Sequence, residues 1–506
     1  MSANFVSVDR NQSLLLPPDL KDWVPGDDLV HFVVAAVEGL NASAFRVNHR
    51  GTGSAQYPPA MMLALLIYCY ANGIFSSRRI ERATYRDIAV RYLTADTHPD
   101  HDTIAKFRRE NFDAVAACFV HVLELAQAAG LLKVGTVSVD GTKLKANASI
   151  DRNVRYDRAG QLIEQLEREV HDLLEQAEET DGQDEADGQQ LPEELARREG
   201  LKEKLEAARA QIEARRKAKA ETEQAEYERK VKERADKGEK RGREPKAPDP
   251  EPDPKTQQNL TDPDSRLMRK NLRSGFEQAY NAQATVDADG TQLILAARVT
   301  NHSCDKNELL PDIEAIPPSL GQPTNVLADT GYLNRRQAAP LEAQGLDLYI
   351  ATGKEGRRRK HDFRPEPKSA KPKPQIRSPW IRAMKDKLLT DEGRARYARR
   401  QCTVEPVFGI IKAALGFRQF HLRGKEKAQG EWTLIALAYN LKRLHTLDRG
   451  NKVRPGSPTT PQRQPDNAIT VPARLAVRFM LNALTTDTTE TEAWITRTPL
   501  PSPTGC

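Results

Sequence analysis

The spacing of apolar residues changes along the chain from helical to strand-like near residue 134. Residues 27–130 carry apolar positions at helical spacing, divided by capping residues and glycines, which predicts several short helices. Beyond them, short β-branched apolar runs between turn residues predict strands. The expected strands are Val134–Asp140, Glu277–Asp287, Gln292–Thr300, Thr324–Asp329 and Leu346–Ala351. Helices are expected at Asn307–Ile316, at Leu333–Gln344 and around Glu405.

This order of elements, βββαβαβα, predicts an α/β fold with a mixed five-stranded sheet flanked by helices, the ribonuclease-H-like arrangement. A long charged insertion separates the first two strands, and two apolar stripes in it predict an antiparallel helical hairpin; a dimerising coiled coil is the alternative. The expected domains are a helical N-terminal DNA-binding domain (1–130), a catalytic domain (131–156 and 271–447), the hairpin with a disordered tether (157–270) and a weakly ordered tail (448–506).

The composition favours a cytoplasmic protein with a polyanionic partner. The chain has 506 residues, and 77 Lys+Arg against 71 Asp+Glu give a net charge of +6. Basic residues are concentrated at 78–109, 354–374 and 394–443, which suits nucleic acid, although a solvated basic surface is the alternative for each run. Five scattered cysteines without zinc-ligand spacing indicate reduced thiols. Neither a secretory leader nor a membrane-spanning run is evident, so no membrane partner is expected.

Three acidic residues stand in contexts that favour a shared metal site. Asp140 and Asp329 each close a predicted strand, and Glu405 lies in a predicted helix. Carboxylates from separate elements can surround one point, where their repulsion requires a cation, and oxygen ligands favour Mg²⁺ or Mn²⁺. Two such ions would support in-line phosphoryl transfer. For each residue alone, a solvated turn or cap is the more common role.

Basic residues in the N-terminal region suggest contact with DNA. Arg78, Arg79, Arg108 and Arg109 lie on predicted short helices and are expected to face outward. Short helices joined by tight polar turns are typical of helix-turn-helix-like DNA-binding units. The alternative is a helical packing domain with a basic surface.

Several segments resemble the DDE-type transposases of bacterial insertion sequences, which have a ribonuclease-H-like catalytic domain. They are Val139-Asp140-Gly-Thr, Leu327-Ala-Asp329-Thr-Gly-Tyr332, and a late helix that carries Tyr397, Arg400, Glu405 and Lys412. The segment Leu434–Arg443 resembles the helix that commonly follows. The resemblance covers roughly residues 25–445 without the hairpin. It implies that Asp140, Asp329 and Glu405 are the catalytic metal ligands, and that Tyr397, Arg400 and Lys412 contact DNA near the scissile phosphate.

The resemblance also implies an activity and its partners. The protein would bind the terminal inverted repeats of its own element and, with two Mg²⁺ or Mn²⁺ ions, cleave the ends and transfer them to target DNA. It would act as a homodimer or larger synaptic complex at the nucleoid of the bacterial cytoplasm. The alternatives are a ribonuclease-H-like nuclease or domesticated transposase without strand transfer, and a non-catalytic DNA-binding scaffold.

Two details of the late helix depart from the simplest expectation. The family signature has three residues between its Arg and Glu, whereas four separate Arg400 from Glu405, so Arg399 or Arg396 could take the role. Pro406 directly follows Glu405 and predicts a kink there. A further carboxylate, Asp305, could join the metal site, but an N-cap of the following helix is the favoured role.

Overall fold

The computed structural model describes residues 19–40, 44–47, 55–180, 190–236, 244, 246–270, 273–353, 376 and 378–451. The predicted C-terminal tail from residue 452 onward and the basic segment 354–374 lie outside the described residues.

The described residues before the sheet are helical, as expected. The helices are α1 (Leu20–Trp23), α2 (Leu29–Glu38), α3 (Pro59–Ala71), α4 (Ser77–Arg86), α5 (Ile88–Leu93), α6 (His101–Glu110) and α7 (Phe112–Ala128). Acidic N-caps begin several of them: the carboxylate of Asp28 accepts a hydrogen bond from the Val30 amide, and that of Asp100 accepts from the amides of Asp102 and Thr103. Helix α3 is buried along most of its length, because its sequence is apolar on every face.

The central sheet has the strand order β6-β5-β1-β7-β8, with β4 also paired to the start of β5. Its strands are β1 (Thr136–Lys145), β4 (Arg266–Met268), β5 (Glu277–Asp287), β6 (Ile294–Thr300), β7 (Asn325–Ala328) and β8 (Asp347–Ile350). Strands β6, β5 and β1 run antiparallel, whereas β1, β7 and β8 run parallel. This mixed sheet confirms the predicted ribonuclease-H-like arrangement.

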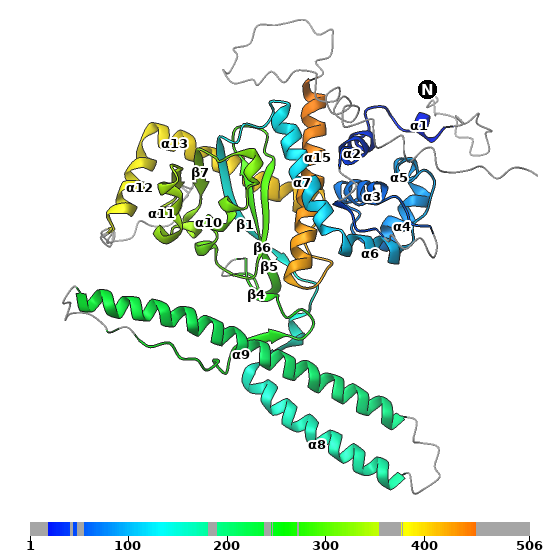
Figure 1. Cartoon of the computed structure of the whole chain (residues 1–506), viewed down its shortest axis with the longest axis vertical. Helices are drawn as coiled ribbons and strands as arrows, with labels where there is room; N and C mark the ends of the chain where they lie inside the picture. Colours follow the sequence, from blue (N-terminus) through cyan, green and yellow to red (C-terminus); the bar gives the residue numbers. More distant parts are fainter. Residues whose placement is uncertain are drawn as a thin grey trace, which may run out of the picture.

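Helices cover the sheet and connect its strands. They are α10 (Leu309–Glu314), α11 (Arg335–Ala343), α12 (Pro379–Leu389), α13 (Asp391–Ala398), α14 (Val404–Gly409) and α15 (Lys425–Asn451). Helices α7 and α15 lie between the sheet and the other N-terminal helices (Figure 1). No described helix combines the length and the apolar character needed to cross a membrane.

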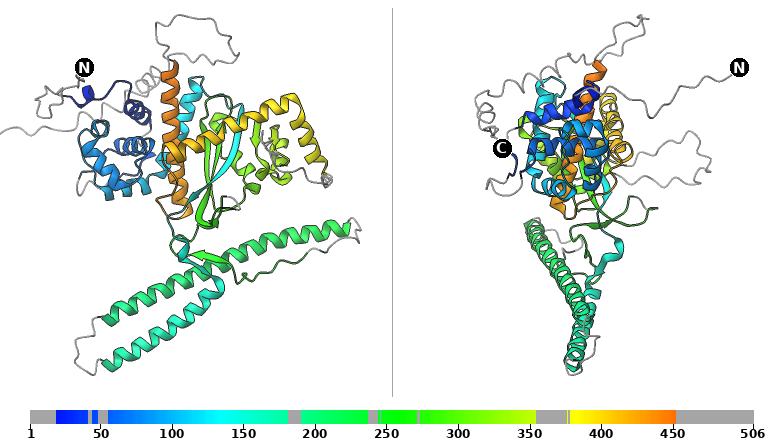
Figure 2. Two further views of the ribbon diagram at one scale, coloured as in Figure 1. Left: turned by 180° about the vertical axis from the view of Figure 1, so that it is seen from behind. Right: turned by 90° about the vertical axis from the view of Figure 1, so that its right-hand side faces the viewer.

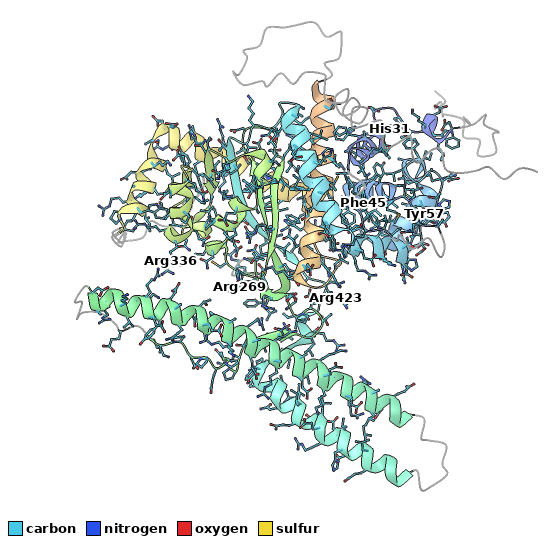
Figure 3. All side chains as sticks on the ribbon, in the orientation of Figure 1. His31, Phe45, Tyr57, Arg269, Arg336 and Arg423 are labelled. Atoms are coloured by element: carbon cyan, nitrogen blue, oxygen red, sulfur yellow. The ribbon has the colours of Figure 1, made fainter. Side chains whose placement is uncertain are left out.

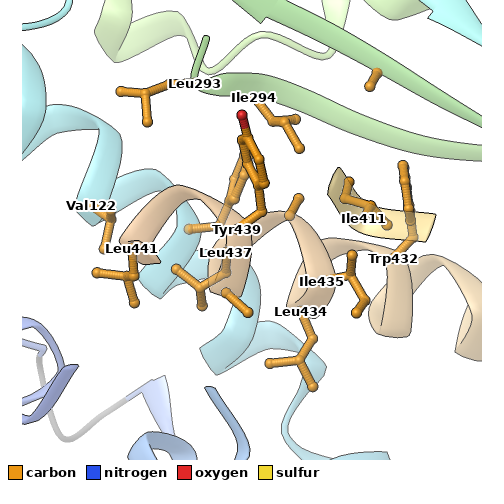
Figure 4. Close-up of a cluster of buried hydrophobic side chains, with 14 of the residues drawn as sticks. Val122, Leu293, Ile294, Ile411, Trp432, Leu434, Ile435, Leu437, Tyr439 and Leu441 are labelled. Atoms are coloured by element: carbon orange, nitrogen blue, oxygen red, sulfur yellow. The ribbon is translucent and has the colours of Figure 1, made fainter. Parts of the chain in front are cut away.

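Helix α15 joins the N-terminal helices to the sheet through one continuous apolar core. Its residues Leu434, Leu437 and Leu441 are buried with Val122 of α7 and Ile294 of β6 (Figure 4). Polar side chains of α15 also bind the outer edge of β6. Asn440 accepts from the Ile294 amide and donates to the Ile294 carbonyl, both at 2.8 Å, and Gln429 makes the equivalent pair with the Val299 amide and the Ala297 carbonyl. These bonds satisfy backbone amide and carbonyl groups of β6, an edge strand that could otherwise pair with a strand of another chain.

The insertion is a helical hairpin, as predicted, but its second helix is much longer than its first. Helix α8 (Tyr156–Thr180) packs against the first half of α9 (Gln190–Asp236) around a small core that includes Leu166 and Leu205. A two-stranded sheet of β2 (Asn153–Arg155) and β3 (Gln257–Asn259) closes its base. The hairpin projects from the core (Figure 2).

The second half of α9 continues past the start of α8 along the catalytic core. There Arg336 of α11 points toward α9 and forms an ion pair with Glu226 at 2.6 Å (Figure 3). The expected tether is also partly anchored, because the Arg216 guanidinium donates to the carbonyls of Glu251 and Asp249. These contacts fix the direction of a helix whose far half has few apolar residues.

Candidate active site

Asp140 lies in the middle of the central strand of the sheet. It is the fifth residue of β1 and pairs with Ala284 of β5. The expectation that Asp140 closes its strand is therefore wrong. Residues Gly141–Lys143 are small or polar, yet they continue the strand with Leu144 and Lys145, because β5 supplies hydrogen-bond partners for them. The Gly141 amide donates to Oδ1 of Asp140 at 2.9 Å.

Asp329 lies directly after the adjacent parallel strand, as predicted. Strand β7 ends at Ala328, and the Asp329 carboxylate then caps a short 3₁₀ turn by accepting from the Gly331 amide at 2.7 Å. Because Val139 of β1 is in register with Ala328 of β7, Asp140 and Asp329 occupy equivalent positions on neighbouring strands. The sheet itself therefore brings these two carboxylates together.

Glu405 lies in the first turn of helix α14. The single helix expected from Tyr397 to Lys412 is wrong: α13 ends at Ala398, a 3₁₀ turn spans Arg399–Cys402, and a π-helical segment spans Ile410–Ala414. Pro406 does not kink a helix, because α14 begins only two residues earlier and a first-turn residue needs no amide donor. The Glu405 side chain is 53% exposed, so it faces solvent at the edge of the site.

Arg400 connects the carboxylates of β1 and α14. One guanidinium nitrogen lies 3.4 Å from Oδ2 of Asp140 and another lies 3.6 Å from Oε1 of Glu405. Tyr397 forms a side-chain hydrogen bond with Arg400. Burial by itself would lower the pKa of Arg400, but Asp140, Tyr397 and Asp329 together raise it above its usual value. Arg400 thus carries a fixed positive charge between two of the three predicted carboxylates.

The alternative arginines have other partners. Arg399 is exposed and pairs with Asp289 at 3.0 Å, and Arg396 pairs with Glu392 at 2.9 Å. The extra residue between Arg400 and Glu405 is accommodated by the 3₁₀ turn and the non-helical Thr403. Among these three arginines, the geometry places only Arg400 beside Asp140 and Glu405.

Burial makes the charge of Asp140 unfavourable in the absence of a cation. Burial is the main cause that raises the pKa of Asp140, Arg400 and the Gly141 amide lower it, and the carboxylates Asp329 and Asp305 raise it; together these effects bring the pKa to about 7. A divalent cation beside Asp140 would instead favour the ionised carboxylate. Among the described residues, no group of three or more acidic, histidine or cysteine side chains lies close enough together to hold a metal ion in the present side-chain positions.

Lys412 reaches the same strand from the π-helical segment. Its ammonium group donates hydrogen bonds to the Thr142 hydroxyl and, at 3.2 Å, to the Lys143 carbonyl. Burial lowers the pKa of Lys412 to about 8, and the charge of Lys270 contributes. Lys412 therefore contacts β1 at Thr142, two residues from Asp140. Its ammonium group loses its proton at a lower pH than that of an ordinary lysine.

We expect the contribution of Lys412 to DNA binding to disappear as the pH rises through 8. A Lys412→Arg variant keeps its charge, so it should bind a DNA duplex roughly fivefold more tightly than the wild type at pH 9, which is about 1 kcal/mol, and similarly to it at pH 7. Fluorescence anisotropy across this pH range measures the ratio. A ratio that does not change with pH would contradict the assignment.

Asp305 is bound to strand β5, although sequence reasoning favoured a capping role for it. It is the first residue of a 3₁₀ turn, and its carboxylate accepts hydrogen bonds from the side chains of Asn281 at 2.7 Å and Gln283 at 2.8 Å. No backbone amide of the following turn is capped by it, so the favoured N-cap role is wrong. Both amide side chains come from β5, more than 20 residues away in sequence.

The structure separates the four basic residues predicted to contact DNA in the N-terminal region. Arg78 and Arg79 on α4 and Arg109 on α6 are exposed. Arg108 is only 6% exposed, and its guanidinium donates to the Tyr70 hydroxyl at 2.7 Å and to the Phe75 carbonyl at 2.9 Å. The expected outward position of Arg108 is therefore wrong, because these buried acceptors hold it inside.

Replacing Arg108 is expected to destabilise the fold. Tyr70 also donates to the buried carboxylate of Glu431 on α15, so Arg108→Ala leaves this cluster without its cation and should cost roughly 2–4 kcal/mol of unfolding free energy. Arg109→Ala is the matched control and should change stability by less than about 0.5 kcal/mol. Urea unfolding of both variants tests this, and equal stabilities would contradict it.

Comparison with known protein families supports the resemblance noted in the sequence. Residues 255–441 match the family model described as "Transposase DDE domain", and residues 18–110 match "Transposase domain (DUF772)". This chain belongs to the DDE transposases of insertion sequences. No curated protein and no solved structure was found to match the transposase. The DDE match contains Asp329, Glu405 and Asp305, whereas Asp140 precedes it, so the place of Asp140 depends on the geometry of β1.

The family assignment fixes the general chemistry of this transposase. A transposase DDE domain implies phosphoryl transfer on DNA, and the family typically uses divalent metal ions. The hairpin helices α8 and α9 precede the DDE match and follow the N-terminal match.

Proposed function

We propose that this transposase binds the terminal inverted repeats of its own insertion sequence, cleaves the element ends and joins them to target DNA. One observation carries the proposal: the sheet brings Asp140 and Asp329 to equivalent positions on adjacent strands, and Arg400 links Asp140 to Glu405. Two copies or more would assemble around the paired ends, because both ends of an element must be processed together.

Asp140, Asp329 and Glu405 are the residues that would hold the divalent ions. Their carboxylate oxygens are the hard ligands that Mg²⁺ and Mn²⁺ prefer, and the buried charge of Asp140 calls for a cation. Two bound ions would activate the attacking water or 3′-hydroxyl and stabilise the leaving 3′-oxygen. Asp329 has a second oxygen with no hydrogen-bond partner among the described residues, which leaves it free for this role.

The cationic side chains around the carboxylates would position the DNA strand. Arg400 and Lys412 flank Asp140 along β1, and Tyr397 is fixed against Arg400. Charged groups of this kind bind phosphate oxygens and place the scissile phosphate. The exposed Arg78, Arg79 and Arg109 would contact the duplex farther from the site, without reading its sequence by themselves.

The test is cleavage of an end-labelled duplex that carries one terminal inverted repeat and its flanking DNA. The wild type with Mg²⁺ is expected to nick at the junction and, with a supercoiled target present, to yield joined products. Asp329→Asn should yield neither product, while Glu314→Gln, an exposed carboxylate on α10, should act as the wild type. Cleavage without joined products would favour a nuclease without strand transfer. Binding without cleavage by the wild type would favour a DNA-binding scaffold.

A further inference from the structure

Helix α4 carries its basic side chains on one exposed face. Its other side packs into the protein, where Ile80, Ala83 and Thr84 are buried. Successive residues of a helix advance by about 100° around its axis, so the exposed side chains fall within an arc of about 120°. These side chains, called here the α4 face, are Arg78, Arg79, Arg82, Tyr85 and Arg86. Arg82 lies at the centre of the arc.

The arginines of the α4 face have no acidic partners. In the described part of the chain, no carboxylate forms an ion pair with any of the four. Glu81, the one acidic residue of α4, instead contacts His101 of α6 at 2.9 Å. On the surface helix α9, by contrast, Arg198 pairs with Glu194 one turn earlier, at 2.9 Å. Like charges one turn apart repel each other and destabilise a helix, and a polyanion beside the α4 face would offset that repulsion.

Tyr85 adds a fixed aromatic group to this face. Its side chain is 57% exposed, and its ring stacks on that of His98 with centroids 3.8 Å apart and an interplanar angle of 16°. His98 is held in turn by the Thr84 hydroxyl, which lies 3.1 Å from Nδ1. A rigid, exposed tyrosine beside arginines is typical of a surface that binds a partner.

Contacts with the catalytic domain fix the position of α4. The ring of Phe75, two residues before the helix, packs edge-on against Phe417 with centroids 5.3 Å apart, and the Phe75 carbonyl accepts from buried Arg108 at 2.9 Å. Ile80 belongs to the same apolar core as the sheet. Helix α4 lies on the far side of α7 and α15 from the sheet (Figure 1). DNA bound to the α4 face would therefore have a defined place relative to the candidate active site.

We propose that α4 lies in the major groove of the terminal inverted repeat, with Arg82 on base edges and the flanking arginines of the α4 face on phosphates. This inference rests on the proposed function, since it assumes that the protein binds the repeat. A helix with its side chains is about 10–12 Å wide and fits a major groove of about 12 Å. The central position of Arg82 directs it to the floor of the groove, where a guanidinium group can donate two hydrogen bonds to one base.

The experiment measures binding of the full-length protein to two labelled duplexes by fluorescence anisotropy, in chelator and at one salt concentration. One duplex carries the terminal inverted repeat, and the other is a scrambled duplex of the same composition. Arg82→Lys keeps the charge but loses the two-donor geometry. It should bind the repeat about tenfold more weakly than the wild type and the scrambled duplex within about twofold of it.

Two controls separate base contacts from charge. Arg86→Gln removes a charge from the same helix, so it should weaken binding to both duplexes by the same factor and leave the preference for the repeat unchanged. Arg168→Gln removes an exposed charge from α8 and should bind both duplexes as the wild type does. Unchanged binding of both duplexes by Arg86→Gln would overturn the placement of α4 on DNA.

The wild type distinguishes failure of this inference from failure of the proposed function. If the wild type prefers the repeat and Arg82→Lys keeps the full preference, the role of Arg82 is overturned and the proposed function stands. If the wild type binds both duplexes equally, recognition of the repeat fails and the inference fails with it. Circular dichroism checks the fold of each variant. If Arg82→Lys proves misfolded, Arg82→Gln decides: a lost preference for the repeat supports the proposal, and a retained preference overturns it.

Discussion

Asp140→Asn is expected to abolish DNA cleavage and, at the same time, to stabilise the metal-free protein. Loss of cleavage follows from the loss of a carboxylate at the centre of the proposed cation site, and it should exceed about a thousandfold. The gain in stability follows from burial, which makes the ionised carboxylate unfavourable. A residue that destabilises the fold and is required for the reaction is typical of a functional site.

The stabilisation should depend on pH in a defined direction. The pKa of Asp140 is about 7 in the folded protein and near 3.8 in the unfolded chain, so the folded state binds the proton more tightly. Ionisation of Asp140 therefore lowers the free energy of unfolding of the folded protein. This loss grows as the pH rises from about 4 to about 7, reaches about 4 kcal/mol and then stays constant. Asparagine does not ionise. The difference between Asp140→Asn and the wild type should be largest near pH 8 and small near pH 4.

Urea unfolding in chelator at pH 4.5 and pH 8 measures this difference, and the cleavage assay with Mg²⁺ measures the loss of activity. Glu314→Gln is the control, since it removes an exposed charge on α10 and should change neither quantity. Addition of Mg²⁺ should raise the unfolding midpoint of the wild type and leave that of Asp140→Asn unchanged. An active Asp140→Asn, or one that is less stable than the wild type at pH 8, would contradict the assignment.

Arg400→Ala is expected to reduce cleavage by about a hundredfold or more and to shift its pH dependence. Arg400 carries the positive charge that lies between Asp140 and Glu405, and no other described arginine or lysine forms an ion pair with either. Removal of a fixed positive group from a phosphoryl-transfer site costs on this order. Because Arg400 lowers the pKa of Asp140, its loss should raise that pKa, and activity should then rise at a higher pH than in the wild type.

Arg399→Ala is the matched control. Arg399 is the neighbouring residue, it is exposed and its partner is Asp289, so its loss should change cleavage by no more than about twofold. Arg400→Lys should retain part of the activity, because an ammonium group supplies the charge but cannot present two separate nitrogens to Asp140 and Glu405. Steady-state rates between pH 6 and pH 9 distinguish the variants. A severe defect in Arg399→Ala with an active Arg400→Ala would return the role to the alternative arginine.

The sequence predicted elements well where apolar periodicity was local. Five of the six strands of the sheet, all but β4, and their order along the chain follow from β-branched runs bounded by turn residues. Asp329 was correctly placed because β7 ends where its apolar run ends. The two stripes of the hairpin predicted its helices for the same reason. The length of α9 was missed, because its second half is charged and its direction depends on partners such as Arg336.

Errors arose where partners distant in sequence determine the conformation. Asp140 was placed at a strand end because polar residues follow it, yet β5 pairs with those residues and extends β1 to Lys145. Arg108 was expected to face outward because its local pattern is that of a surface residue, whereas the Tyr70 hydroxyl and the Phe75 carbonyl hold it inside. Neither partner can be identified from spacing.

The sequence by itself determined the identity of this protein as a DDE transposase, the order of its strands and the three candidate carboxylates, because these depend on short motifs and on local periodicity. Only the tertiary structure decided which arginine lies beside Asp140, that Lys412 reaches β1, and that Asp305 accepts hydrogen bonds from β5. These arrangements depend on contacts between β1, β5 and α14, which the hairpin insertion and the loops separate in sequence. Electrostatic effects such as the raised pKa of Asp140 follow from burial, and burial exists only once those elements have packed.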